Sequence, residues 1–276
     1  MNKTRLTTIW FMLMSCITMA YSQNYNITEE ADLNNDNAVD VTDLSELIDI
    51  VLGKSQPVDE PVPTLWYAVG ACIGDGSWTN TAEAIGTSML PLYATSESGV
   101  YEYVGYLTTA DFKLVGNPGL WGYQWGSSDG GLTPVANDQS SQNLCVPENG
   151  FYRVVLDTNN NLLTIDEVEA PERSYGSIGM PGRFQNWAPA DPNVQMNSFD
   201  TFEGAPNHNW TLVITMSETE RPGVKFAANG DWSVNWGSEG WPTGYGTQDG
   251  PNIPYQPGTY RVFFNDITGA YRFIAQ

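Results

Sequence analysis

The sequence KFAANGDWSVNWG at residues 225–237 decides the fold class, because an earlier stretch of the chain repeats its pattern. Residues 112–126 read FKLVGNPGLWGYQWG. Each stretch has a lysine near its start and two tryptophans spaced i and i+4 near its end. Short runs of Val, Phe, Tyr and Ala separated by Gly, Asn, Asp and Pro are typical of β-strands joined by turns.

Further landmarks flank both stretches in the same order, which indicates an internal repeat. We define the first repeat as residues 65–170 and the second repeat as residues 174–276. The landmarks of the first and second repeats are YAVG at 67–70 and YGSIG at 175–179, Trp78 and Trp187, NL at 143–144 and NI at 252–253, and GFYRV at 150–154 and GTYRV at 258–262.

Apolar and polar residues alternate within the landmark strands. Tyr152, Val154 and Leu156 alternate with Arg153, and the same pattern recurs at Tyr260, Val262 and Phe264. Turn sequences at 157–160 and 266–269 then predict hairpins before a last strand. No helical periodicity of useful length follows Gly53. We therefore expect an all-β fold of two tandem antiparallel β-sandwich modules, preceded by a short calcium-loop and helix repeat.

The composition excludes several function classes. The 276 residues include 11 Lys and Arg against 32 Asp and Glu, which gives a formal net charge of −21. Such a surface repels nucleic acids and anionic membranes. His208 is the one histidine, so a multi-histidine zinc site is excluded and a histidine triad is nearly excluded. With 41% hydrophobic residues, the chain can still build a substantial core.

The N-terminus predicts export. Lys3 and Arg5 precede a mostly apolar, uncharged run from 6 to 20, and a small-x-small pattern ends at Ser22. These features predict a signal peptide over residues 1–22. The run is short for a membrane-spanning helix. An alternative is a weak lipobox at 13–16 that would leave Cys16 acylated and anchor the chain to a membrane.

Two cysteines remain after the leader. Cys72 and Cys145 both lie in the first repeat. An exported protein meets oxidising conditions, so we favour one disulfide between Cys72 and Cys145. The alternative is a pair of buried free thiols.

Residues 32–43, DLNNDNAVDVTD, have the spacing of a calcium-binding loop. Oxygen-bearing side chains and one backbone carbonyl, that of Ala38, fall at the ligand positions, and Asn37 stands where the loop must turn sharply. A helix with apolar residues at Leu44, Leu47, Ile48 and Val51 follows. The predicted Ca²⁺ ligands are Asp32, Asn34, Asp36, Ala38, Asp40 and Asp43.

This loop and helix, within residues 23–54, resemble one repeat of a type I dockerin. Dockerins carry two such repeats, and this chain has one. The alternative is an acidic, solvated helix start without a cation. Residues 55–64 are rich in proline and acidic, so we expect an extended linker there.

The repeated tryptophans are the most informative candidates for function. If they lie in strands, Trp121 and Trp125 share one face, as do Trp232 and Trp236. Flat indoles stack against the C–H faces of sugar rings, and neighbouring polar groups bind the hydroxyls. The alternative, favoured for Trp125 and Trp236, is that they fill the core. The candidate carbohydrate-binding residues are Trp78, Lys113, Trp121, Trp187, Lys225, Asn229, Asp231, Trp232, Trp236 and Trp241.

Both repeats resemble the β-sandwich modules of the SusE/SusF family of outer-membrane starch-binding proteins. The resemblance covers residues 65–276 and is closer in the second repeat. It implies non-catalytic glycan binding, with starch as the archetypal ligand, by a chain secreted from a Gram-negative bacterium or held at its outer-membrane surface. The residues that carry it are Ile178-Gly179, Asn186-Trp187, 225–237, 250–253 and 258–262.

The leading hypothesis is thus a carbohydrate-binding protein whose cofactor is Ca²⁺ and whose partner is a polysaccharide. Outer-membrane transport or surface proteins are further candidate partners. A glycoside hydrolase is an alternative, but it needs two carboxylates across a cleft, and no acidic pair recurs in both repeats. The other alternative is a structural or interaction protein of a surface assembly, tethered through the calcium repeat.

Overall fold

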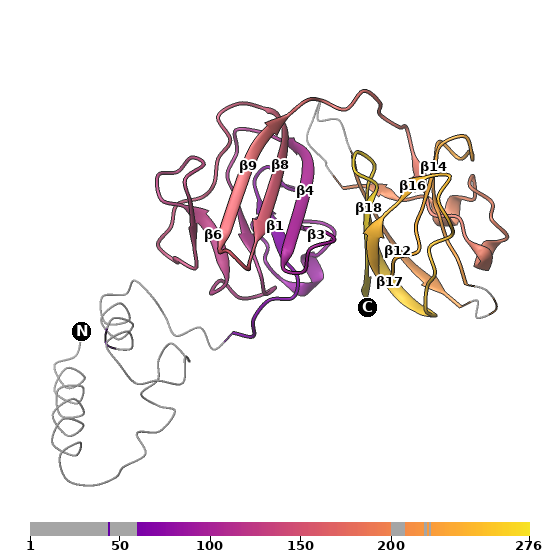
Figure 1. Cartoon of the computed structure of the whole chain (residues 1–276), viewed down its shortest axis with the longest axis horizontal. Helices are drawn as coiled ribbons and strands as arrows, with labels where there is room; N and C mark the ends of the chain where they lie inside the picture. Colours follow the sequence, from indigo (N-terminus) through magenta and orange to yellow (C-terminus); the bar gives the residue numbers. More distant parts are fainter. Residues whose placement is uncertain (1–43, 45–59, 200–207, 218–219, 221) are drawn as a thin grey trace, which may run out of the picture. The chain divides into compact units, whose positions relative to one another are not determined.

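The computed structural model describes Leu44 and residues 60–199, 208–217, 220 and 222–276. By its internal contacts the chain divides after residue 57, and both repeats lie in the unit of residues 58–276 (Figure 1). The predicted leader, calcium loop and first part of the linker lie outside the described residues. So does the helix predicted after the loop, apart from Leu44, which is helical.

The first repeat forms two antiparallel sheets, ordered β2-β1-β5-β6-β7 and β3-β4-β8-β9. Their elements are β1 (Tyr67–Gly70), η1 (Ala82–Ala84), β2 (Met89–Pro91), β3 (Tyr93–Ala94), β4 (Val100–Leu107), β5 (Phe112–Val115), β6 (Gln124–Ser127), β7 (Pro134–Ala136), β8 (Gly150–Asp157) and β9 (Leu162–Val168).

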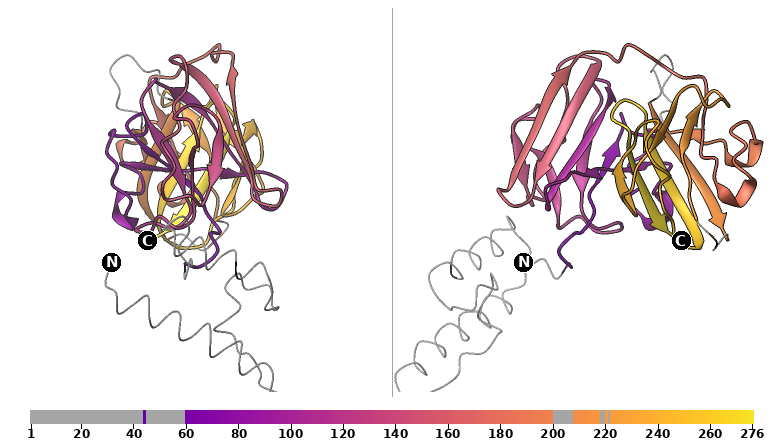
Figure 2. Two further views of the ribbon diagram at one scale, coloured as in Figure 1. Left: turned by 90° about the vertical axis from the view of Figure 1, so that its left-hand side faces the viewer. Right: turned by 45° about the vertical axis from the view of Figure 1, so that its right-hand side comes forward.

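The second repeat, orange to yellow in Figure 2, also forms antiparallel sheets. Their strand orders are β10-β13-β14-β16 and β11-β12-β17-β18-β15. Its elements are β10 (Ile178–Gly179), η2 (Arg183–Gln185), η3 (Pro192–Val194), β11 (Asn197–Ser198), β12 (Asn209–Met216), β13 (Phe226–Ala228), β14 (Asn235–Gly237), β15 (Thr243–Tyr245), β16 (Thr247–Gln248), β17 (Gly258–Asn265) and β18 (Ala270–Ala275).

The two repeats share one strand order. The order β1-β5-β6-β7 corresponds to β10-β13-β14-β16, and β3-β4-β8-β9 corresponds to β11-β12-β17-β18. Strands β2 and β15 are the additions. Among the described residues, no sheet combines strands of both repeats. For the two repeats as the structure describes them, the prediction of an all-β fold with antiparallel sheets is confirmed.

The predicted alternation of buried and exposed residues is present in the central hairpins. In β8, Tyr152, Val154 and Leu156 are buried while Arg153 is exposed. Buried residues from both sheets of the first repeat form one apolar cluster, so the two sheets cover each other. In the second repeat, Phe264 of β17 stacks on Phe226 of β13 at a centroid distance of 4.1 Å.

Strand β17 also buries one apolar side chain, that of Phe263, on its other face. Phe263 belongs to the apolar cluster of the first repeat, together with Phe199 and Ala270. Phe263 is fully buried. The second repeat therefore packs on the first through the outer face of its five-stranded sheet.

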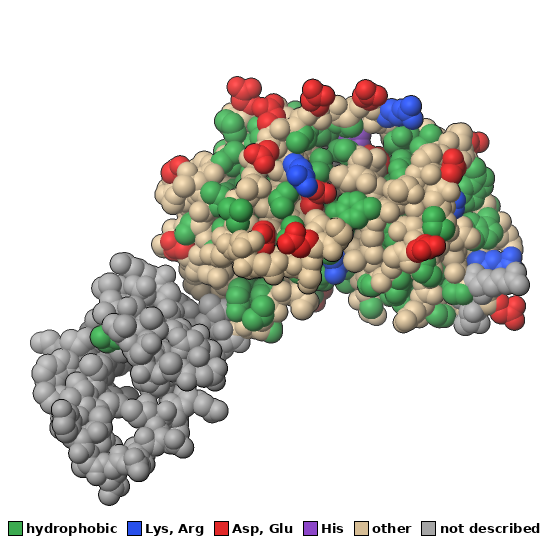
Figure 3. All heavy atoms as spheres, viewed as in Figure 1, with side chains coloured by type: hydrophobic (Ala, Val, Ile, Leu, Met, Phe, Trp, Pro, Cys, Tyr) green, Lys and Arg blue, Asp and Glu red, His purple; other side chains and the backbone are tan. Residues whose placement is uncertain are grey.

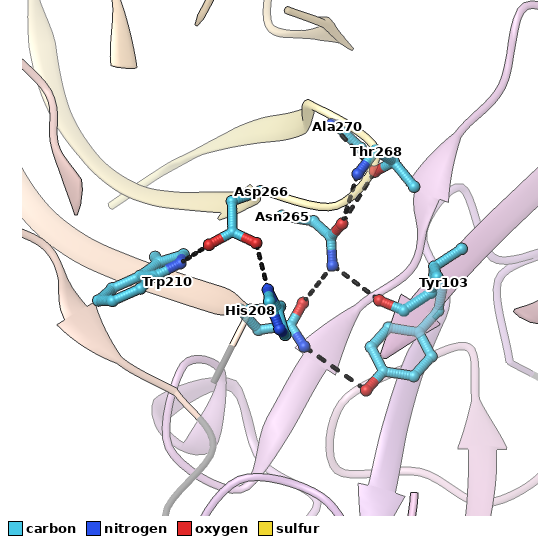
Figure 4. A network of polar contacts seen from close by, with 9 residues as sticks. Tyr103, His208, Trp210, Asn265, Asp266, Thr268 and Ala270 are labelled. Atoms are coloured by element: carbon cyan, nitrogen blue, oxygen red, sulfur yellow. Dashed lines mark hydrogen bonds and ion pairs between the residues drawn. The ribbon is translucent and has the colours of Figure 1, made fainter. Parts of the chain in front are cut away.

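Polar groups line this contact (Figure 4). Asn265 Nδ2 donates to the Val104 carbonyl at 2.7 Å and to Asn209 Oδ1 at 2.9 Å. Asp266 accepts from Trp210 Nε1 at 2.9 Å and lies 2.5 Å from His208 Nδ1. The single histidine, His208, is 1% exposed and thus belongs to the interior.

The surface carries the acidic character of the composition. Figure 3 shows Asp and Glu side chains spread over one face of the described residues, with few Lys and Arg among them. No helix in the described part of the chain is both long and apolar enough to span a membrane.

The predicted disulfide is wrong: Cys72 and Cys145 are both free thiols. The Cys145 thiol donates a hydrogen bond to the Thr109 carbonyl at 3.4 Å. Cys72 fills the core as a small apolar side chain, and burial raises its pKa to about 12.

The end of the predicted linker is not a free spacer. The carboxylate of Glu60 accepts from the Gly122 N–H at 2.7 Å and from the Tyr123 N–H at 3.4 Å. Asn117 Nδ2 donates to the Pro61 carbonyl at 2.8 Å. Residues 60–61 are thus bound to the turn that precedes β6.

We predict that Phe264→Ala lowers the free energy of unfolding by about 3–5 kcal/mol, because it leaves a cavity under the stacked Phe226. Chemical denaturation measures the change. The control is Leu162→Ala, since Leu162 is 51% exposed and its truncation should cost less than about 0.5 kcal/mol. Equal losses in the two variants would contradict the packing described for β17.

Candidate functional site

The same hydrogen-bond pattern supports one tryptophan-bearing turn in each repeat. In the first repeat, Gln124 Oε1 accepts from Lys113 Nζ at 2.7 Å, and Gln124 Nε2 donates to the Trp121 carbonyl at 2.8 Å. In the second, Asn235 Oδ1 accepts from Lys225 Nζ at 3.0 Å, and Asn235 Nδ2 donates to the Trp232 carbonyl at 2.9 Å. We call this pattern the lysine–amide link.

Trp121 and Trp78 line one shallow pocket of about 270 Å³ in the first repeat. Asn80 brings their loops together, because its amide donates to the Leu120 carbonyl at 2.7 Å and its Oδ1 accepts from Gly119 N at 3.2 Å. Trp78 is 38% exposed. The other lining residues are Lys113, Gln124, Gln139 and Asn143.

Lys113 is already saturated inside the protein. Its ammonium donates to Gln124 Oε1, to the Ser141 carbonyl at 3.0 Å and to Ser141 Oγ at 2.9 Å. An ammonium has three N–H groups, so none is left for a ligand. Burial lowers the pKa of Lys113. Its predicted role as a ligand contact is therefore wrong, and it holds the pocket wall instead.

In the second repeat, Trp187 is displayed by an unusual backbone. Asn186 and Trp187 both have positive φ angles, 59° and 60°. Such a conformation is rare for a bulky residue and persists where its surroundings fix it. Here Trp187 N donates to the Gly182 carbonyl at 3.0 Å, and Gln185 is bonded to both backbone groups of Ala188 at 2.7 Å.

Trp187 faces Trp232 across the surface of the second repeat. Their ring centroids are 6.2 Å apart and their planes are tilted by 50°. Trp232 is 37% exposed. The Lys225 ammonium makes one hydrogen bond to the described residues, to Asn235 Oδ1, and so has further donors to offer. Asp249 accepts from Asn235 Nδ2 at 2.8 Å, and this bond lowers the pKa of Asp249.

Two candidate tryptophans do not belong to this site. Trp236 is 9% exposed and packs edge-on against Phe264 at 5.1 Å, so the favoured prediction that Trp236 fills the core is confirmed and its listing as a binding residue is wrong. Trp241 is partly buried against Tyr260 and Phe273 at centroid distances of 5.2 and 4.8 Å. The prediction that the two tryptophans of each pair share one strand face is wrong. Trp121 and Trp232 lie in turns before β6 and β14, where side chains do not alternate between two faces as they do in a strand.

Asn229 and Asp231 shape the turn that leads to Trp232. Asn229 has a φ of 54°, and its Oδ1 accepts from Gly176 N at 2.9 Å. Asp231 accepts from Ser233 N at 2.6 Å, and hydrogen bonds from the Ser233 side chain and then its backbone lower the pKa of Asp231. Both side chains are exposed, but the contacts they make in the structure are with neighbouring protein groups.

Several lining and supporting residues were not predicted from the sequence. Gln124 shares position i+3 after a tryptophan with Asn235, which is a signal that could have identified it. Gln139 has no repeated landmark near it, and Asn143 belongs to the repeated NL landmark, which was not linked to the tryptophans. Glu60 belongs to the linker, and nothing in its sequence context marks it as a partner of the turn at Trp121.

Comparison with known proteins does not assign the chain to a family. No family model matches the chain, and no curated protein matches it. Among solved structures, the chain is similar to SusF from Bacteroides thetaiotaomicron, with a TM-score of 0.29 and 17% sequence identity over 76% of this chain and 48% of that one. The aligned part thus spans about half the length of SusF. A likeness this weak carries no argument about function.

We predict that Gln124→Leu destabilises the protein by about 1–3 kcal/mol, because it leaves the Lys113 ammonium and the Trp121 carbonyl each short of a partner. Chemical denaturation followed by tryptophan fluorescence measures both the loss and the change near Trp121. Gln139→Leu is the matched control, since Gln139 is exposed and lines the same pocket. A Gln124→Leu variant as stable as this control would show that the lysine–amide link has no structural role.

Proposed function

We propose that the chain is a non-catalytic carbohydrate-binding protein with two tandem β-sandwich modules, residues 65–170 and 174–276. The observation that carries the proposal is the pair of neighbouring indoles of Trp187, which is half-buried, and Trp232, which is exposed, on a turn that Asn235 connects to Lys225. Indole faces supply apolar surface for sugar C–H groups, and the lysine supplies donors for hydroxyls. The corresponding pair in the first repeat, Trp78 and Trp121, supports it.

The tilt between the Trp187 and Trp232 rings favours one shape of polysaccharide chain over another. Two faces inclined at 50° form a bent surface, which suits a chain that curves better than a flat ribbon. Starch is therefore the first polysaccharide to test. Each site would bind weakly, and two sites on one chain would bind a polymer more strongly through their effective concentration.

The polar groups at the first site favour binding over hydrolysis. Glycoside hydrolysis requires two carboxylates on opposite sides of the bond. The described residues that line the Trp78 and Trp121 pocket are amides, a lysine and indoles. Glycan capture needs no more than these groups.

We further propose that the chain is exported through its leader and acts outside the cell, secreted or at the outer-membrane surface. The Pro-rich residues 55–64 would separate the binding modules from the calcium repeat. Residues 32–43 would hold one Ca²⁺, which stabilises a loop whose acidic side chains otherwise repel one another.

We predict that the double variant Trp187→Ala/Trp232→Ala loses most of the retardation in native gels containing soluble starch. Loss of two stacking faces should weaken binding by about 1–3 kcal/mol each, by analogy with base stacking on aromatic side chains. The variant Trp78→Ala/Trp121→Ala should lose less, because Lys113 has no free donor. Leu162→Ala is the exposed apolar control. If the Trp187/Trp232 variant migrates like the parent in every gel, the site is misassigned.

We predict that the chain binds one Ca²⁺ and that Asp36→Ala/Asp40→Ala weakens this binding at least about tenfold, because two of the charged ligands are removed. Isothermal titration with CaCl₂ after chelation measures it. The control is Glu97→Gln, which removes one exposed charge far along the sequence from the loop. Absence of calcium binding by the parent chain would reduce the loop to a solvated acidic segment.

A further inference from the structure

A second, larger pocket lies where the two repeats meet. Its volume is about 500 Å³, and it contains none of the tryptophans assigned above. Asp75, Gly86 and Thr87 of the first repeat line one side. The five-stranded sheet of the second repeat lines the other, through Thr211 and Val213 of β12 and Arg261 of β17.

Arg261 of the second repeat lies against Gly86 of the first repeat. Its side chain passes over the backbone of Gly86, where an added Cβ would lie 2.7 Å from Arg261 Cδ. Gly86 has a φ of 91°, so glycine satisfies both the backbone and the close approach. Among the described residues, Arg261 takes part in neither an ion pair nor a side-chain hydrogen bond. Its guanidinium thus lines the pocket with unused donors.

Thr211 is the second polar group without a partner. It is 6% exposed, and its Oγ1 is buried with no hydrogen bond. A buried hydroxyl in this state has a free-energy cost that a ligand could remove. Thr211 and Val213 project from one face of β12, and Val213 is the register partner of Arg261, so all three share the wall of the pocket.

Asp75 supplies the opposite charge. Its carboxylate accepts from Ser77 N at 2.9 Å and from Ser88 Oγ at 3.1 Å, and each oxygen retains a further lone pair. Asp75 and Arg261 line the same pocket without forming an ion pair. A ligand between them must offer acceptors to the guanidinium and donors to the carboxylate.

We propose that this pocket binds one neutral sugar residue of a polysaccharide. Sugar hydroxyls donate and accept at once, so they can satisfy Arg261, Asp75 and Thr211 together. An anionic ligand would be repelled by Asp75 and by the chain's net charge of −21. A cationic ligand would be repelled by Arg261. The ligand class rests on the proposed function, but the residues and the pocket are independent of the tryptophan pairs.

The test uses the whole chain in native gels that contain soluble starch, galactomannan, xylan or polygalacturonate. The background is the variant in which Trp78, Trp121, Trp187 and Trp232 are all replaced by alanine. We expect residual retardation by one neutral polysaccharide, and a further weakening of about tenfold on adding Arg261→Met, which keeps the apolar stem over Gly86. Arg173→Met, at an exposed site, is the charge-matched control. Thr211→Val is a second, nearly isosteric variant should Arg261→Met unfold.

Four results would overturn the proposal. Residual retardation that neither Arg261→Met nor Thr211→Val reduces excludes this pocket. Complete loss of retardation in the four-tryptophan background, with Arg261→Met in the parent chain unaffected, leaves the tryptophan sites valid and removes this one. Retardation only by polygalacturonate, reduced by Arg261→Met, assigns a carboxylate ligand instead. No retardation of the parent chain by any neutral polysaccharide rejects this pocket and the proposed function together.

Discussion

The packing of Phe263 and Phe264 on opposite faces of β17 is the constraint on which the arrangement of the two repeats depends. Successive side chains of a strand point to opposite faces of the sheet, so one core cannot bury both rings. Phe264 enters the core of its own repeat and Phe263 enters the apolar cluster of the first. Arg261 lies two residues before Phe263 and shares its face, which places Arg261 at the pocket between the repeats.

Polar groups at this contact have to find partners because they are removed from water. Asn265 and Asn209 bind each other and reach Val104 and Tyr103 of the first repeat. Truncating one member would leave the others buried and unpaired, which costs more than the bond itself contributes. Such a network therefore favours one packing arrangement of the repeats over neighbouring ones.

The lysine–amide link supports a turn in both repeats, but its lysine has free donors in only one of them. In both repeats it fixes the turn that carries a tryptophan, the half-buried Trp121 in the first repeat and the exposed Trp232 in the second. Lys113 has all three donors satisfied, whereas Lys225 has one described acceptor. The difference arises from Ser141, which reaches Lys113 through its carbonyl and hydroxyl oxygens. Equivalent positions in a repeat can thus be structural in one copy and available for binding in the other.

The sequence by itself determined the all-β class, the internal repeat and the hairpin near the end of each repeat, because alternation at 150–157 and 258–265 and the turn residues that follow are local signals. It also marked Trp78, Trp121, Trp187 and Trp232 as candidates. Only the tertiary structure decided which tryptophans are exposed, that Trp236 belongs to the core, that Cys72 and Cys145 are not bonded, and that Arg261 meets Gly86. These outcomes depend on contacts between residues far apart in the chain, and local pattern contains no information about which distant side chain fills a given space.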